Sequence, residues 1–532
     1  MARLSLDHPG WAAHAATFAR GQAWDADGRL LRAADLAKRF DALADADGWA
    51  ALAGSLNGMF AAVRAADGRV HAAVDRLRSI PLFFAATPDG FAVADSAWPV
   101  LARMSNPQLD ALAAAEFHLT GYTTGSATLF EGLGQLPAGH VFASDGSTAQ
   151  AGALHRFYGF EHRDFLDEPE ARAIERLASL HERVFRRLLD DVGDRPLVVP
   201  LSGGYDSRLI GVALRDLGAR DVLCYTYGTQ GNWESRISQE LAAHLGFRWT
   251  MIPYSAERWR EWGALPAFRR YFHDSGNASS SPHFQDWPAV HALHASGRLA
   301  PDAVFVPGHS GDFLAGSHVP VRLAQSASPT REDVLDAILD AHYSLWDWPP
   351  DPDDALRTTL ARRIEAITGP IEPDSPESAA STFELWDCAE RQAKFIVNSV
   401  RVYESFGYEW RLPLFDGELM DFWSRIPVDQ RIGRRLYFAY VAARQAIPVT
   451  GANIDYAPPA MAAIRLVERL GLKPMALRAR RALRRLRWRR EYEGGTMGWY
   501  ALVDPGEFRR RYTGREIAHA FFARQYLNAM PR

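Results

Sequence analysis

The sequence predicts an α/β protein in which an antiparallel, β-sandwich-like α+β domain precedes a doubly wound parallel sheet with a helical C-terminal part. Two changes of pattern along the chain carry this prediction. Residues 1–160 consist of short alternating segments broken by Asp-Gly turns, which is typical of antiparallel hairpins. Residues 168–450 alternate apolar strands with amphipathic helices, which indicates a parallel sheet covered on both faces. Residues 451–532 form an arginine-rich extension with helical patterning.

The individual elements follow from these patterns. In the first domain, the alternating segments lie at residues 60–64, 66–70, 82–86 and 89–93. In the second, an amphipathic helix at 170–189 precedes strands at 198–201, 222–227 and 250–253, with helices at 208–217 and 234–245 between them. Longer helices are expected over 333–445, including one at 384–406.

Composition limits the function classes. The 532 residues exceed what one hydrophobic core usually supports, and a hydrophobic fraction of 47% is ample for two or three. A net charge of −4 provides no general attraction to nucleic acid, and no apolar run reaches the roughly 20 residues that span a bilayer. The two cysteines, Cys224 and Cys388, are too few for a disulfide framework. We expect a cytoplasmic protein with no nucleic-acid partner and no membrane span; a homodimer stays open.

The most informative motif follows the strand at 198–201. This strand runs directly into Ser202-Gly203-Gly204-Tyr205-Asp206-Ser207 and then into a helix. The glycines allow the backbone to approach phosphate oxygens, the serine hydroxyls and the free N–H groups of the helix face the anion, and Asp206 can hold Mg²⁺. The motif therefore predicts a site for a magnesium-bound nucleoside triphosphate; the alternative is a glycine turn without a ligand.

The Ser-Gly-Gly-x-Asp-Ser motif resembles the loop of ATP pyrophosphatases (the PP-loop), and the chain up to about residue 440 resembles the asparagine synthetase family. Residues 56–62, 75–84, 91–97 and 136–140 resemble landmarks of the family's glutaminase domain, which has an Ntn-type fold. Residues 308–312 with Gly316 resemble its second pyrophosphate and magnesium loop. Residues 409–416 resemble its Glu-x-Arg-x-Pro-Phe-Leu-Asp segment.

The resemblance implies ATP and Mg²⁺ as cofactors and assigns the site residues. Magnesium would be held by Asp206 and Asp312. Nucleotide contacts would come from Leu201, Ser202, Gly203, Gly204, Asp206, Ser207, Tyr225, Tyr227, Gly228 and Gly308. His309 or Glu409 would accept a proton from the attacking amine, although His309 could instead bond a loop carbonyl and Glu409 could be a structural partner of Arg411.

Three departures from the family pattern stand out. Ala2 occupies the place of the nucleophilic cysteine, so the first domain is expected to be a degenerate glutaminase without glutamine hydrolysis. His309 replaces the Glu or Tyr of related loops. The family lysine has no counterpart between residues 431 and 459, so its role would pass to a residue elsewhere. The candidates are Lys394, Lys473, Arg401 and Arg411.

The expected activity is that of a carbon–nitrogen ligase of the asparagine synthetase type. It would convert a small-molecule or peptide carboxylate into an acyl-adenylate, release pyrophosphate, and pass the acyl group to ammonia or a separate amine donor. The candidate acids are aspartate and a sugar uronate of surface polysaccharide. The acid would face residues 273–287, with Phe284 and Trp287 as flat surfaces; the alternative for this segment is a polar, turn-rich loop without a ligand. The alternatives are a lasso-peptide or β-lactam type cyclase and a non-catalytic nucleotide-binding scaffold.

The arginine-rich stretch at 477–490 has two interpretations. Leu477, Leu483 and Leu486 would dock on the fold while the arginines of a solvated helix face stay in water, or the stretch would bind an anionic substrate, lipid or partner.

Overall fold

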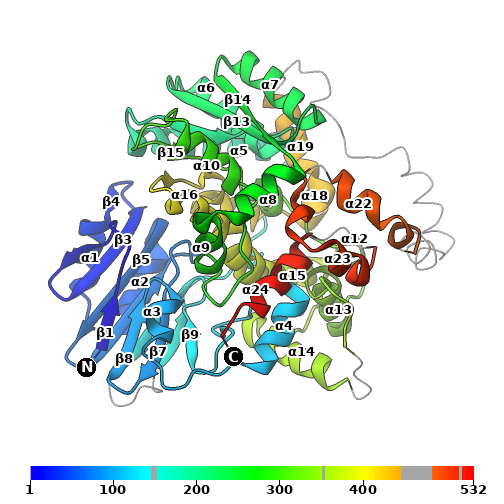
Figure 1. The fold of residues 1–532 in the computed structure, drawn as a ribbon. Coiled ribbons are helices and arrows are strands. Elements are labelled where there is room, and N and C mark those ends of the chain that lie inside the picture. The colour runs from blue at the N-terminus through cyan, green and yellow to red at the C-terminus, as the bar shows by residue number, and fades with distance from the viewer. Residues whose placement is uncertain are drawn as a thin grey trace.

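The computed structural model describes residues 2–144, 152–349, 354–444, 482–495, 497–514 and 518–531. These residues form three sheets with helices around them (Figure 1). Two sheets belong to the N-terminal part and one, entirely parallel, to the part that follows. The mixed α/β class is therefore confirmed. No helix within these ranges is long and apolar enough to cross a membrane.

The N-terminal part contains a four-stranded and a seven-stranded sheet. The first has the order β1 (Ala2–Ser5), β8 (Gly90–Ala94), β7 (Phe83–Thr87), β9 (Leu133–Gln135). The second has the order β11 (Gly152–Arg156), β10 (His140–Ser144), β6 (Arg69–Val74), β5 (Asn57–Ala66), β3 (Thr17–Trp24), β2 (Ala12–His14), with β4 (Leu30–Arg32) paired to β3. The predicted hairpins are present as β5–β6 and β7–β8.

The period-two alternation of these strands explains how the sheets stack. In β5, Ala61 and Val63 face the other sheet, whereas Phe60 and Ala62 face α1 (Ala33–Asp41) and α2 (Ala46–Ser55). The rings of Phe84 and Phe142, one from each sheet, lie 4.5 Å apart between centroids. The opposite face of the small sheet packs on α3 (Ala97–Leu101) and α4 (Ala111–Thr120). The result is a two-sheet sandwich with helices outside.

The third sheet is parallel, with the order β14 (Arg248–Tyr254), β13 (Val222–Thr229), β12 (Leu197–Pro200), β15 (Val304–Phe305), β16 (Glu409–Trp410). Helices cover both of its faces. Thr226 bonds Ser238 of α7 (Trp233–Leu245), while its neighbour Tyr225, which points to the other face, bonds Asp286 at the start of α10 (Trp287–Ala295). The doubly wound arrangement is thus present, with α5 (Glu170–Val192) and α6 (Tyr205–Asp216) flanking β12 along the chain.

The region predicted to be helical, 333–445, is helical in the structure: it contains α13 (Arg331–His342), α14 (Ala355–Thr368), α15 (Pro376–Asp387), α16 (Arg401–Ser405), α17 (Gly417–Trp423), α18 (Val428–Arg431) and α19 (Arg435–Arg444). The helices α8 (Ala256–Ala264), α9 (Pro266–Asp274), α11 (Gly311–Leu314) and α12 (Val321–Ala324) lie before this region and were not predicted. The helix expected at 384–406 is present but is not uniform. Between α15 and α16 it widens into a π-helical segment, Cys388–Ile396, and tightens into a 3₁₀ turn, Val397–Val400.

The C-terminal extension contributes α22 (Trp488–Gly494), α23 (Pro505–Arg511) and α24 (Ala518–Asn528). In Figure 1 the red α24 lies beside α4, and Tyr526 of α24 packs on Phe117 of α4 with ring centroids 5.9 Å apart. The expected docking of the arginine-rich stretch is wrong for Leu483 and Leu486, which are 49% and 82% exposed. Leu477 lies outside the described residues.

Candidate functional site

The candidate site lies at the carboxyl edge of the parallel sheet, where two loops meet. The first loop follows β12 and is taken here with the start of α6, as residues 202–207; the second follows β15 and is taken with the start of α11, as residues 307–312. The strands are neighbours, with Val198 paired to Phe305, so both loops leave the same edge of the sheet. In open α/β sheets this edge is where ligands bind.

The first loop is organised by its two serines. Ser207 Oγ accepts a hydrogen bond from the Ser202 backbone N–H at 3.1 Å, and Ser202 Oγ accepts one from the Gly204 N–H at 3.1 Å. A Cβ atom on Gly203 would lie 3.0 Å from the ring of Trp233, so this ring rests against the loop. No motif of the sequence marks Trp233, because its contact with the loop depends on the position of α7 in the fold.

The two loops touch at glycines. A Cβ on Gly308 would lie 2.9 Å from the backbone nitrogen of Ser207, closer than real Cβ contacts occur. A Cβ on Gly311 would lie 3.1 Å from Oδ1 of Asp206. Glycine is therefore required at position 308, where the close contact is with backbone, whereas a side chain at position 311 would need the neighbouring side chains to shift slightly.

Asp206 and Asp312 lie next to each other across this contact. The Asp312 backbone N–H donates to Asp206 Oδ2 at 3.1 Å, the Tyr437 hydroxyl donates to Asp206 Oδ1 at 2.6 Å, and Ser317 Oγ donates to Asp312 Oδ2 at 3.0 Å. Burial, together with the charge of Asp312, raises the pKa of Asp206 to about 7. Two adjacent carboxylates repel each other, and a divalent cation would relieve that repulsion.

The donor set suits Mg²⁺ in particular. Within the described ranges, no group of three or more His, Cys, Asp or Glu side chains could hold a metal ion. Mg²⁺ commonly binds through one or two carboxylates and completes its shell with substrate phosphates and water. Asp206 and Asp312 fit that requirement.

Tyr225, Tyr227 and Gly228 lie on β13, which continues past the end of β12 and so borders the carboxyl edge. The Tyr225 side chain is fully buried, and its hydroxyl donates to Asp286 at 2.8–2.9 Å. The ring of Tyr227 stacks on Tyr254 with centroids 5.2 Å apart. Both rings are thus engaged in packing, which leaves the backbone of this strand for contact with a base.

His309 lies in the second loop, where its Nε2 forms a 2.6 Å hydrogen bond with the hydroxyl of Ser399. Burial, with a smaller contribution from His283, lowers the pKa of His309 to about 3. The imidazole is therefore neutral at physiological pH and a weak base.

Glu409 does not reach the loops, contrary to the prediction. Its strand β16 pairs with β15 so that Glu409 is level with Val304, the first residue of β15, at the amino end of the sheet. Its carboxylate is 58% exposed and pairs with Arg411 at 2.9 Å and Arg195 at 3.0 Å. The structural alternative, a partner of Arg411, is therefore correct.

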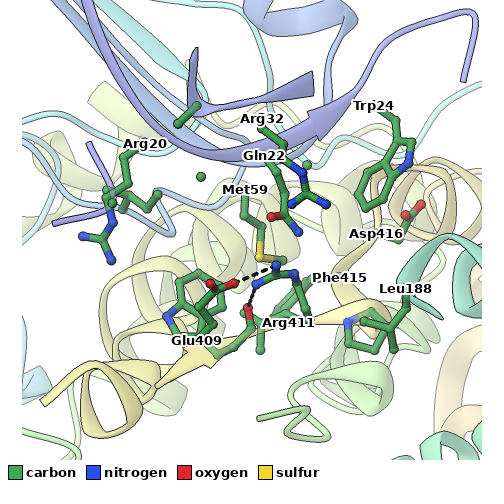
Figure 2. A pocket seen from close by; sticks show the side chains of 18 of the residues that line it. Arg20, Gln22, Trp24, Arg32, Met59, Leu188, Glu409, Arg411, Phe415 and Asp416 are labelled. Atoms are coloured by element: carbon green, nitrogen blue, oxygen red, sulfur yellow. Dashed lines mark hydrogen bonds and ion pairs between the residues drawn. The ribbon is translucent and has the colours of Figure 1, made fainter. Parts of the chain in front are cut away.

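Figure 2 shows where this pair lies. Glu409 and Arg411 line a cavity of about 300 Å³ together with residues of the N-terminal sheet, among them Gln22 and Arg32. This cavity lies between the two parts of the chain and is distinct from the loop site, because no residue of either loop lines it.

Lys394 is also placed away from the loops. Its ammonium donates to Thr123 O at 2.9 Å, Gly125 O at 2.7 Å and Glu390 at 2.7 Å, which uses all three of its protons. Its assignment as a catalytic residue is therefore corrected: Lys394 joins the π-helical segment to the N-terminal part.

The other candidates for the role of the family lysine that the structure describes are also paired with acids away from the loops. Arg401 pairs with Glu404 at 2.6 Å, and Arg411 pairs with Asp191 and Glu409 in the contact between the two parts. Lys473 lies outside the described residues. The structure instead brings Arg434, three residues before Tyr437, close enough to Asp206 for its charge to offset part of the rise in the pKa of that carboxyl. Arg434 follows Gly433 in a left-handed pair (φ +64° and +60°), a backbone feature that the helical pattern concealed.

Residues 273–287 contribute less than expected to a substrate surface. Phe284 packs on Phe522 of α24 with centroids 4.5 Å apart, and Trp287 packs on Phe268, so both rings belong to the core. The flat-surface assignment is therefore wrong for Phe284. Trp287 is buried but also lines a cavity of about 460 Å³ with Asp274, Ser275 and Asn277 of the same segment. Ser281 of this segment does line a cavity of about 250 Å³.

Fold and site together define an α/β protein with two glycine-containing loops and a carboxylate pair at the carboxyl edge of a parallel sheet. The model of the family described as asparagine synthase matches residues 177–448, just over half of the chain. The chain belongs to this family. A comparison with curated proteins gave no match.

Proposed function

We propose that the protein is an ATP-dependent, amide-forming carbon–nitrogen ligase that activates a carboxylate as an acyl-adenylate. The observation that carries this proposal is the direct contact of the two loops, which places Asp206 and Asp312 side by side at the carboxyl edge of the sheet. Membership of the asparagine synthase family supports the reaction class. Adenylation is required because a free carboxylate is a poor electrophile.

The residues of the two loops have distinct roles in this proposal. The backbone of Gly203 and Gly204, the hydroxyls of Ser202 and Ser207 and the first N–H groups of α6 hold the phosphates. Mg²⁺, when bound by Asp206 and Asp312, supplies positive charge for the departing pyrophosphate. Arg434 takes the place of the missing family lysine as the nearby protein cation; among the described residues it makes no ion pair that would compete.

The amine comes from outside the N-terminal domain, because Ala2 provides no thiolate for glutamine hydrolysis. Ammonia or a separate amine donor then attacks the adenylate and displaces AMP. With its low pKa, His309 acts as a positioning residue that fixes the second loop against Ser399. The acid is aspartate or a sugar uronate.

The test is acid-dependent exchange of labelled pyrophosphate into ATP. We expect exchange with at least one acid of a panel that includes aspartate and galacturonic acid, and its loss in Asp206→Ala. Product analysis by mass spectrometry with ammonia present then identifies the amide, and a cyclised product would point to the cyclase alternative. Tight Mg-ATP binding without exchange for any acid would mean a nucleotide-binding scaffold and would overturn the ligase proposal.

A further inference from the structure

The helical stretch 482–494 packs on the rest of the C-terminal extension through one side. It consists of helical residues at 482–486 followed, after one residue, by α22. Trp488 and Tyr492 are partly buried on the packed side, and the Tyr492 hydroxyl donates to the Val503 carbonyl oxygen at 2.8 Å. Among the elements drawn in colour in Figure 1, α22 lies at the edge of the molecule, on the side away from the N-terminal sheets. The helix is therefore held to the fold by aromatic side chains.

The other side of this helix carries two leucines that face the solvent. Leu483 is 49% exposed and Leu486 is 82% exposed, the highest value among the large apolar side chains of the described residues. At 3.6 residues per turn, Leu486 lies on the side of the helix opposite to Trp488, and Leu483 lies about one turn before it. Single exposed leucines are normal on protein surfaces, but two neighbours on an outward side form an apolar patch.

Exposed arginines surround Leu486. Arg489 and Arg490 follow it at the spacing of neighbours along a helix, and Arg485 lies directly before it. All three arginine side chains are exposed, and none of them makes an ion pair with another residue that the structure describes. Their charges are therefore available to a partner of the opposite sign.

A second helix adds to this positive surface. The guanidinium groups of Arg489 and of Arg509, from α23, both lie over the ring of Trp488, 5.6 and 5.9 Å from its centroid. The acid Glu491 is already paired with an arginine of the packed side at 2.8 Å, so Glu493 is the acid of the stretch that opposes the exposed charges. The surface is thus positive in a protein whose net charge is −4.

We propose that this leucine–arginine surface binds an anionic lipid bilayer; it is formed by Leu483, Leu486, Arg485, Arg489, Arg490 and Arg509. The guanidinium groups would contact lipid phosphates, and the leucines would enter the boundary between headgroups and acyl chains, as in amphipathic helices that lie on membranes. Charge complementarity selects an anionic partner. The exposed leucines favour lipid over nucleic acid, because most contacts to nucleic acid are made with its polar phosphates and sugars. This inference does not depend on the ligase proposal.

The first test is co-sedimentation of the full chain with lipid vesicles. Phosphatidylcholine vesicles that contain about 30 mol% phosphatidylglycerol should bind at least about tenfold more tightly than phosphatidylcholine alone, since each arginine near an anionic surface contributes about fivefold in affinity. Raising the ionic strength from about 0.15 M to about 1 M should remove most of this preference, because the Debye length falls from about 8 Å to about 3 Å. Equal binding to both kinds of vesicle, or binding to neither, would overturn the inference.

A triple substitution tests whether this surface makes the contact. The variant with Arg485→Gln, Arg489→Gln and Arg490→Gln should bind the anionic vesicles about 10²-fold more weakly than the wild type. The matched control changes the net charge equally by replacing three exposed arginines elsewhere in the chain, Arg69→Gln, Arg220→Gln and Arg362→Gln. It should bind like the wild type. Equal weakening in both variants would mean that overall charge, rather than this surface, governs binding, and the proposal would fail.

A fluorescent label distinguishes a bilayer from other partners. The two cysteines of the chain, Cys224 and Cys388, are both buried, so a thiol introduced by Leu486→Cys can be labelled selectively with an environment-sensitive dye. Anionic vesicles should shift the emission of this label to shorter wavelength. A label introduced through Val321→Cys, at a position of α12 that is 56% exposed, should not respond.

Three outcomes of this experiment would contradict the proposal. An unchanged emission on vesicle binding would mean that the leucines do not enter the bilayer. Tighter binding to duplex DNA than to anionic vesicles at the same ionic strength would identify nucleic acid as the partner. A shift that appears without vesicles as the protein concentration rises would identify a second copy of the chain.

Leu486→Ser separates binding from folding. Because Leu486 points away from the fold, this variant should keep the melting temperature of the wild type. It should bind the anionic vesicles about tenfold more weakly, because the apolar area that enters the bilayer is lost. A lower melting temperature would show that the leucine packs on the protein, and unchanged vesicle binding would show that it does not contact lipid; either result would overturn the inference.

Discussion

Asp206 carries the strongest pH dependence that the structure predicts for ligand binding. Its pKa is raised to about 7 by burial and by Asp312, and a carboxylate must lose its proton before it can hold Mg²⁺. Mg-ATP affinity should therefore rise between pH 6 and pH 8 in calorimetric titrations. Asp206→Asn should bind more weakly and lose this pH dependence. A wild-type affinity that is flat across this range would contradict the assignment.

The same shift affects stability without ligand, with the opposite direction. Because the folded-state pKa lies above the unfolded value, protonated Asp206 favours the folded state at low pH, and this contribution is lost as the pH rises through about 7. In the absence of Mg²⁺, the melting temperature of the wild-type protein should fall between pH 6 and pH 8. The melting temperature of Asp206→Asn should fall less over the same range. Differential scanning calorimetry of both proteins at the two pH values measures the difference.

The low pKa of His309 predicts that this residue does not shape the dependence of the catalytic rate on pH. Loss of a true general base costs about 10²–10⁴-fold in rate, whereas a neutral positioning residue with a pKa of about 3 contributes less. The variant His309→Asn can still form a hydrogen bond with Ser399 and should lower kcat by less than about tenfold. The plots of rate against pH for the wild type and the variant should have the same shape. A loss beyond about 10²-fold would restore His309 as the base.

Individual site residues could be predicted from the sequence where they lie within one short motif. Ser202, Ser207 and Asp206 follow from the strand–loop–helix pattern, and Asp312 from its own short motif. Lys394 could not be placed in the same way. Whether its three protons are used depends on Thr123 and Gly125, which are about 270 residues distant in sequence.

The contact between the two loops sets the requirements at the scale of elements. Gly308→Ala would place a methyl group 2.9 Å from the Ser207 backbone nitrogen, and backbone cannot yield as a side chain can. The loops should separate, so Mg-ATP affinity should fall at least about tenfold while the circular dichroism of the protein is retained. Calorimetric titration measures the affinity.

Gly54→Ala serves as the control for this substitution. Gly54 lies in α2, and a Cβ there meets only a ring atom of Phe157 at 3.7 Å, an ordinary contact. The control should bind Mg-ATP like the wild type and be no less stable, because alanine is the better helix former. Equal affinity of Gly308→Ala and Gly54→Ala would mean that the close contact is not needed for nucleotide binding.

Elements with a strong period were predictable, and irregular ones were not. The 3.6-residue pattern indicates a helix at 384–406, yet it carries no sign of the π-helical segment that turns Arg391 and Gln392 towards different neighbours. The two-residue strands β15 and β16 are too short to show any period. The position of Glu409 depends on the register of β16, which explains why its distance from the loops could not be foreseen.

A buried carboxylate is one of several groups that join the two parts of the molecule. Asp191 at the end of α5 is fully buried and accepts hydrogen bonds from Gln22 and Arg32 of the N-terminal sheet and from Arg411. Removal of one partner from such a group commonly costs about 3–5 kcal/mol, because the other charge stays buried. Asp191→Ala should therefore lower the melting temperature by several degrees in scanning calorimetry.

Asp421→Ala is the comparison. Asp421 also joins the two parts, through Arg76 at 2.7 Å, but its side chain is 56% exposed. Exposed pairs contribute at most about 1 kcal/mol, so its loss should be nearly silent. Similar destabilisation by both substitutions would show that the contact is spread evenly over the interface.

The sequence predicted the two kinds of sheet but not the contact between the two parts of the molecule. That contact joins residues that are far apart in the chain, so no local pattern indicates it.

The cavity lined by Ser281, His342 and Arg391 has a consequence for how the protein can be divided. Its wall takes these residues from the segment that matches the family model, and Tyr122 and His519 from the stretches before and after that segment. The flanking stretches therefore complete the structure around the matched segment and are not independent additions to it. A fragment cut to residues 177–448 would lose part of this wall, so we expect it to melt at a lower temperature than the full chain.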